Sequence, residues 1–115
     1  MLAAPHRLRR SRDFTLTVRR GARAGRPDLV VHCLLTAVDE PARIGFTVGA
    51  SVGGSVARHR VSRRLRALAM PLVPTLPAGA SVVVRALPGA STCSHADLQD
   101  QMRGAVAAAV RKAAA

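Results

Sequence analysis

Aromatic and acidic side chains are scarce in this sequence. Among 115 residues, Phe14 and Phe46 are the only Phe, Tyr or Trp, and 6 acidic residues face 18 Lys and Arg, for a formal net charge of +12. The hydrophobic fraction of 49% still suffices for one core, which must be mainly aliphatic. A small domain with so one-sided a charge attracts polyanions, nucleic acid first and anionic membrane second.

Cysteine patterns and long apolar runs are also missing. Cys33 lies in an apolar run and Cys93 in a loop, so neither a disulfide framework nor zinc spacing follows, and "CSH" at 93–95 is at most half a metal site. No segment approaches the roughly 20 apolar residues of a membrane span. Residues 1–14 carry charge where a signal peptide is apolar. We therefore expect a reduced, cytoplasmic protein.

A catalytic centre made by the protein itself is not indicated. The six acidic residues are scattered, and only Asp39 and Glu40 are adjacent, within a turn. No Ser-His-Asp or Cys-His arrangement is supported by the spacing of the histidines and nucleophiles. The composition therefore favours a binding protein over an enzyme with its own active site.

Hydrophobic periodicity and turn residues predict one α+β domain over 1–115, a small sheet with helices packed on it. The predicted elements are a helix at 12–20 capped by Ser11, a loop at 21–28, strands at 29–38 and 43–51, a helix capped by Ser55 within 52–70, a loop at 71–79, a strand at 80–88 and a helix at 94–115 capped by Ser94. The first two strands are expected to form an antiparallel hairpin across the turn at 39–42. The alanine-rich end at 112–115 is expected to fray.

Positive charge concentrates in "ARHRVSRRLRALAM", residues 57–70. On a helical wheel the apolar stripe is Ala57, Val61, Leu65 and Leu68, the opposite face holds His59, Arg60, Arg63 and Arg66, and Arg58 and Arg64 flank the stripe. Like charges three and four residues apart repel, so such a face needs an anionic partner. A phosphate backbone fits it, although arginine stems that merely shield the core are the structural alternative.

The stretch "VGGSVARHRVSRRLR" (52–66) resembles the signature of the bacterial ribonuclease P protein subunit, close to V-G-N-A-V-x-R-N-R-hydrophobic-K-R-hydrophobic-hydrophobic-R. Three more blocks resemble the family in order and spacing: "HRLRRSRDF" (6–14), "RIGFTVGASVG" (43–53) and "VVVRALPGAS" (82–91). The resemblance implies an α-β-β-β-α-β-α domain with one mixed sheet, like the second domain of a small-subunit ribosomal protein. The basic helix would lie in a left-handed crossover between parallel strands, and a short third strand would precede it.

The same resemblance implies the non-catalytic subunit of an endoribonuclease that matures the 5′ end of tRNA. In that family the RNA subunit cleaves the leader from precursor tRNA with Mg²⁺ held mainly by the RNA, and we expect one protein per RNA. The implied contacts to the RNA subunit are Arg58, His59, Arg60, Arg63, Arg64 and Arg66. The implied leader-cleft residues are Phe14, Val18, His32 and Arg10, and a basic arm at 1–12 adds Arg7, Arg9 and Arg12.

The basic helix and the segment before it depart from the family pattern. His59 and Gly54 stand where the pattern has Asn, and Ser62 stands where it has Lys. Residues 49–51, "GAS", lack the lysines that usually follow the second strand. These changes put the His59 contact in doubt and remove positive charge from one edge of the cleft.

The implied cleft is poor in stacking surface, because Val18 and His32 occupy positions that are usually aromatic. Phe14 is open between stacking on a leader base and packing in the core. His32 is open between stacking on a base and satisfying itself within the sheet. The arginines of the arm either supply positive charge to the phosphate backbone of the RNA or are simply solvated.

Two other functions fit the charge alone. A general RNA-binding or ribosomal protein would show salt-sensitive binding to many RNAs without any effect on tRNA maturation. A membrane-surface protein would rely on the terminal helix, which is only weakly hydrophobic and carries Arg111 and Lys112 near its end. The four matching blocks favour the ribonuclease P subunit over both.

Overall fold

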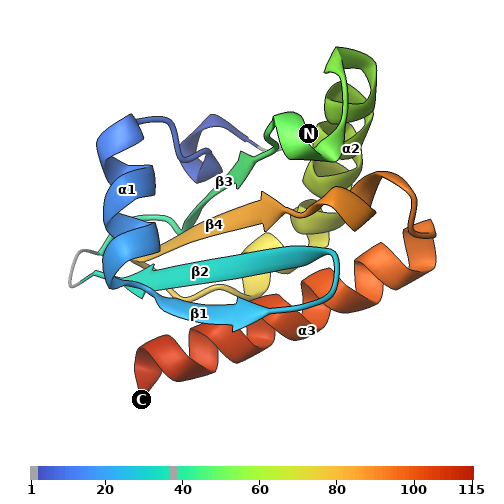
Figure 1. Cartoon of the computed structure of the whole chain (residues 1–115). Coiled ribbons are helices and arrows are strands. Elements are labelled where there is room, and N and C mark those ends of the chain that lie inside the picture. Colours follow the sequence, from blue (N-terminus) through green and yellow to red (C-terminus); the bar gives the residue numbers. More distant parts are fainter. Residues whose placement is uncertain (1–2, 37–38) are drawn as a thin grey trace.

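The computed structural model describes residues 3–36 and 39–115, which form a four-stranded mixed sheet with α1 and α3 on its two faces (Figure 1). The helices and strands are α1 (Ser11–Arg20), β1 (Ala22–Gly25), β2 (Leu29–Leu35), β3 (Arg43–Thr47), α2 (Ser55–Ala69), β4 (Ala80–Ala86) and α3 (His95–Ala114). Short 3-10 turns lie at η1 (Ala4–His6), η2 (Ala50–Val52), η3 (Met70–Thr75) and η4 (Pro88–Ser91). The predicted α+β class is confirmed.

The predicted hairpin between the first two long strands is wrong. The strand order is β1-β2-β4-β3, so β4 lies between β2 and β3, antiparallel to β2 and parallel to β3. The burial explains this order. β2 and β4 are apolar runs covered on both sides, as central strands require, whereas "RIGFT" alternates and ends exposed, as an edge strand can. β3 and β4 are therefore joined through α2.

The segment predicted as a loop at 21–28 contains β1, the short third strand that the family resemblance implies. "ARAG" has no apolar run to announce a strand, and its pairing with β2 places it: Ala22 lies opposite Cys33 and Ala24 opposite Val31. Ala24 is buried at the core. Gly21 ends α1 without a left-handed backbone; a Cβ there would collide with the Thr17 carbonyl oxygen and lie 2.8 Å from that of Cys33.

Helix α3 seals one face of the sheet with an aliphatic stripe. Leu98, Met102, Ala105 and Val106 are buried against β1 and β2, and Val110 is half-buried. Ser94 caps the helix as predicted, since its hydroxyl accepts a hydrogen bond from the Asp97 amide at 3.1 Å. The alanine-rich end, expected to fray, is helical as far as Ala114.

Other predicted boundaries differ in detail. The helices α1 and α2 begin at Ser11 and Ser55, but neither serine caps through its side chain. The proline-rich segment at 71–79, expected to be irregular, begins with the 3-10 turn η3. Within the described residues, no helix is both long and apolar enough to span a bilayer.

Candidate nucleic-acid interface

Helix α2 presents the predicted basic face because its apolar stripe docks at the end of the sheet. Val61, Leu65 and Leu68 are buried, as predicted. The chain turns into the helix at Gly53, whose φ of 150° favours glycine, and a Cβ there would lie 2.9 Å from that of Ala57. The docking leaves His59, Arg60, Arg63 and Arg66 exposed.

The hydrogen bonds of the α2 arginines go to neutral groups. Arg60 donates to the Ser91 carbonyl at 3.4 Å and Arg64 to the Cys93 carbonyl at 3.1 Å, so both lean on neutral groups near the start of α3. Arg58 is half-buried, and its Nε is buried without a hydrogen-bond partner among the described residues. No carboxylate within 3–36 or 39–115 forms an ion pair with an α2 arginine. The face is therefore uncompensated, as an anion-binding surface requires.

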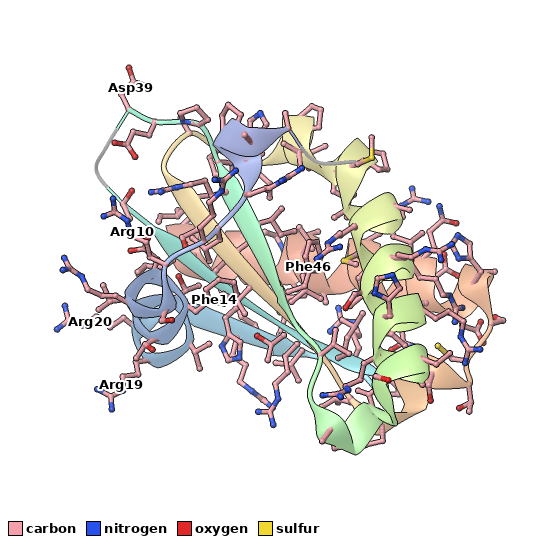
Figure 2. All side chains as sticks on the ribbon, turned by 90° about the horizontal axis from the view of Figure 1, so that it is seen from above. Arg10, Phe14, Arg19, Arg20, Asp39 and Phe46 are labelled. Carbon is pink, nitrogen blue, oxygen red and sulfur yellow. The ribbon has the colours of Figure 1, made fainter. Side chains whose placement is uncertain are left out.

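Phe14 and Arg66, predicted for two different contacts, border one hollow. This hollow, of about 550 Å³, lies along the edge strand β3 and is also lined by Arg7, Arg9 and Phe46. Phe14 lies on the α1 side of it and Phe46 lies toward α2 (Figure 2). The Phe14 ring lies directly over Gly45, where a Cβ would collide with its Cζ. Phe14 is half-buried, so part of the ring stays open to a ligand.

Val18 and His32 lie together in a second hollow, of about 250 Å³, on the same face of the sheet. Thr47, Ser51 and Arg85 also line it. Val18 is 45% exposed, while His32 is 8% exposed and its buried Nδ1 has no hydrogen-bond partner among the described residues. Burial lowers the pKa of His32, and the charges of Arg23 and Arg85 lower it further, so the ring is neutral at neutral pH.

The N-terminal arm is docked against the sheet. The Leu8 amide donates to the Ile44 carbonyl at 3.0 Å, Leu8 is buried, and His6 Nδ1 bonds the Ala42 carbonyl at 2.8 Å. The arm thus continues the edge of β3 and fixes Arg7 and Arg9 beside the first hollow.

Arg10 and Arg12 lie apart from the predicted cleft. Arg10 borders a third hollow, of about 470 Å³, on the other side of the arm, which contains the carboxylates of Asp13 and Glu40. Arg12 is exposed on α1, and Arg19 and Arg20 point from that helix into solvent (Figure 2). The predicted cleft residue Arg10 therefore does not share a hollow with Phe14, Val18 or His32.

We call the face of the sheet that α1 covers the open face, because the hollows of Phe14 and His32 lie on it. Sequence reasoning missed two arginines on the strands of this face. Arg85 follows Ser81 and Val83 on one side of β4, and the alternation in "ASVVVRA" carries that signal. Arg23 lies opposite His32 across the β1–β2 pair, which the sequence does not reveal because β1 has no strand signature.

The cysteine thiols take no part in this surface. Burial raises the pKa of Cys33 to about 11, and burial together with Asp28 raises the pKa of Cys93, so both thiols stay protonated at neutral pH. Over the described ranges, no three His, Cys, Asp or Glu side chains gather where they could hold a metal ion. The guanidinium groups and the partly exposed Phe14 ring of this surface can bind anions and stack on bases.

The comparisons with known proteins agree on one family. The family model described as ribonuclease P matches residues 2–110. The chain is 54% identical over 109 residues to the ribonuclease P protein component of Rhodococcus opacus, covering 90% of this chain and 87% of the relative. It is 49% identical over 114 residues to that of Streptomyces avermitilis, covering 92% and 93%.

Solved structures share the fold at low sequence identity. The RNase P protein of Staphylococcus aureus superposes with a TM-score of 0.77 at 19% identity, covering 90% of this chain and 94% of that one. The RNase P protein of Thermotoga maritima, in complex with 1-(4-fluorophenyl)-2-thiourea, gives 0.74 at 22% identity, covering 85% and 94%. The mixed sheet with its three helices is thus the fold of those proteins.

Proposed function

The chain belongs to the ribonuclease P protein family, and on that premise we propose that it binds the catalytic RNA subunit and the 5′ leader of precursor tRNA. The observation that carries the proposal is the uncompensated arginine face of α2 beside an open, basic hollow that holds Phe14. Together they offer one surface for a folded RNA and another for a single strand. The reaction assisted is the endonucleolytic removal of the leader to give the mature 5′ end.

The α2 face supplies the contacts to the RNA subunit. Arg63 and Arg66 are exposed and grip phosphate oxygens through planar guanidinium groups. Arg60 and Arg64 are steadied by the carbonyls of Ser91 and Cys93, so less side-chain freedom is lost when they bind. Each neutralised phosphate releases counterions, which makes the affinity steeply dependent on salt.

The open face of the sheet supplies the leader site. The exposed part of the Phe14 ring stacks on a base without sequence preference, as a leader of variable sequence requires. Arg66 borders the same hollow from α2, so a strand lying there passes from the RNA-subunit surface into the leader site. The protein thereby raises the affinity for the substrate.

The chemical step belongs to the RNA in this proposal. The two hollows assigned to the leader, those of Phe14 and of His32, offer guanidinium, hydroxyl and imidazole groups rather than the carboxylate oxygens that Mg²⁺ prefers. We therefore assign the Mg²⁺ ions to the RNA subunit and its substrate. We also propose that one protein binds each RNA. The protein's own task is to hold the leader and to offset phosphate charge.

Reconstitution tests the proposal. The purified protein is added to ribonuclease P RNA from its own organism, with a precursor tRNA at low Mg²⁺, and the single-turnover cleavage rate is measured. We expect the protein to raise the rate at low Mg²⁺ and to leave the cleavage position unchanged. No gain over RNA alone, together with equal binding to unrelated structured RNAs, would instead identify a general RNA-binding protein.

A further inference from the structure

The floor of the open face carries a row of polar side chains across three strands. In the sheet register, Arg23 of β1 lies opposite His32 of β2, and His32 lies opposite Val83 of β4. Arg85 is two residues beyond Val83 and so points to the same side of β4. His32 therefore lies between two arginines that belong to different strands.

His32 is a buried polar group without a partner. It is 8% exposed, and its buried Nδ1 has no hydrogen bond among the described residues. Buried polar atoms are nearly always hydrogen-bonded. Because His32 borders the hollow, its ring is the buried polar group that a ligand in the hollow would contact. The hydroxyl-bearing residues Thr47 and Ser51 line the same 250 Å³ hollow.

The charge around the hollow selects an anion. Within the described part of the chain, no carboxylate lines this hollow, and neither Arg23 nor Arg85 forms an ion pair. Both arginines are exposed, and both act on His32 electrostatically. The group facing His32 from α1 is Val18, which brings neither charge nor an aromatic ring.

We propose that Arg23, His32 and Arg85 form a subsite for one phosphodiester group of a single-stranded RNA. The two guanidinium groups and the imidazole donate to the phosphate oxygens, and the neighbouring hydroxyls can add to them. The subsite rests on the proposed function, because the strand it holds is the leader. Because Val18 offers no aromatic ring in this hollow, a leader base cannot stack on that residue. The subsite instead holds the phosphate backbone of the leader through charged hydrogen bonds.

The first experiment measures the affinity of the reconstituted holoenzyme for precursor tRNA with variant proteins. Arg85→Gln and Arg23→Gln should each weaken binding about tenfold, since a charge-assisted hydrogen bond to phosphate is lost. The matched control is Arg103→Gln, which removes the same charge from an exposed position on α3, across the sheet. It should change the affinity less than about twofold.

Abasic leaders separate phosphate from base. The Arg85→Gln penalty should persist when the leader nucleotides are made abasic, and should disappear for mature tRNA without a leader. Equal losses for Arg85→Gln and Arg103→Gln, or a penalty that vanishes with abasic nucleotides, would overturn the subsite. If wild-type protein failed to assist cleavage at all, the proposed function would fail first, and the two failures are therefore distinguishable.

The His32 ring gives a second readout that does not depend on activity. Adding a short single-stranded oligoribonucleotide to the full chain should raise the pKa of His32 in an NMR titration, because a phosphate reverses the local charge. In Arg85→Gln the oligonucleotide should produce a smaller rise at the same concentration. An unchanged His32 titration at saturating oligonucleotide would contradict the proposal even if the affinities were altered.

Discussion

The two faces of the sheet are formed by alternate residues of the same strands, but helices cover them to different extents. One face is sealed along its length by α3, whose 20 residues span about 30 Å, whereas the 10 residues of α1 span about 15 Å of the other. The three buried polar residues of the described chain, Thr17, His32 and Ser81, all belong to the face that α1 covers. The sealed face is aliphatic.

This difference separates stability from binding. The sealed face buries aliphatic side chains in a close-packed core, which is where free energy of folding is gained. On the open face, α1 is anchored by a hydrogen bond of 2.7 Å between the Thr17 and Ser81 hydroxyls. Beyond α1 this face is hollowed, and Thr47, Ser51 and Arg85 border the hollow of about 250 Å³. Changes on the sealed face should therefore alter stability alone, and changes on the open face should alter RNA affinity.

The largest expected effect on stability is on the sealed face. Met102→Ala removes a fully buried side chain and should lower the free energy of unfolding by about 2–5 kcal/mol, measured by urea denaturation. Gln99→Ala, an exposed position on the same helix, is the control and should change it by less than about 0.5 kcal/mol. If the folded Met102→Ala protein bound leader-bearing substrate much more weakly, the separation of the two faces would be wrong.

The next effect is on the open face. Phe14→Ala should raise the Michaelis constant for leader-bearing substrate by an amount equivalent to about 1–3 kcal/mol, the free energy of stacking one base on an aromatic ring. Phe14→Leu keeps most of the volume over Gly45 and removes the aromatic face. A Phe14→Leu protein with wild-type kinetics would assign the ring to packing instead.

A smaller effect is expected for a single arginine of α2. Arg63→Gln should weaken binding to the RNA subunit and lower the slope of log affinity against log salt by about 0.7–0.9, one phosphate contact. The Michaelis constant of the assembled holoenzyme for precursor tRNA should hardly change. Arg111→Gln, exposed near the end of α3, is the charge-matched control, and an equal change in slope for both would mean that total charge alone matters.

The smallest effect concerns pH. Because the pKa of His32 is lowered from 6.5 by burial and by two arginines, the unfolded chain binds a proton at His32 more readily than the folded chain does. The stability linked to this residue is complete above pH 6.5 and is lost as the pH falls toward the folded pKa. Thermal unfolding between pH 7.5 and about 5 should therefore show a shallower acid loss for His32→Asn than for wild type.

Much of the fold was predictable because local signals agree with the final packing. The stripe at Val61, Leu65 and Leu68 predicts which side of α2 is buried, and Ser94 predicts where α3 begins. Strand order was not predictable from these signals, since nothing local in "RIGFT" tells whether it pairs with β2 or β4. β1 was missed because its small residues are held by pairing and by α3 rather than by propensity.

The candidate site was predictable in part for the same reason. The one-signed face of α2 follows from helical spacing, and the family resemblance points to Phe14, Val18 and His32, which the structure places on one face of the sheet. The neighbourhood of Arg23, His32 and Arg85 depends on cross-strand register, which no stretch of sequence contains. Arg10 lies elsewhere because the docked arm, fixed by Leu8 on Ile44, turns it to the far side.

The central claim, that the open face holds the leader, is tested most directly by one comparison of affinities. The dissociation constants of precursor tRNA and of mature tRNA are measured with the RNA subunit alone and with the RNA subunit plus this protein. We predict that the protein tightens binding of the leader-bearing precursor and leaves that of mature tRNA nearly unchanged. Equal tightening of both, or of neither, would contradict the assignment of the open face to the leader.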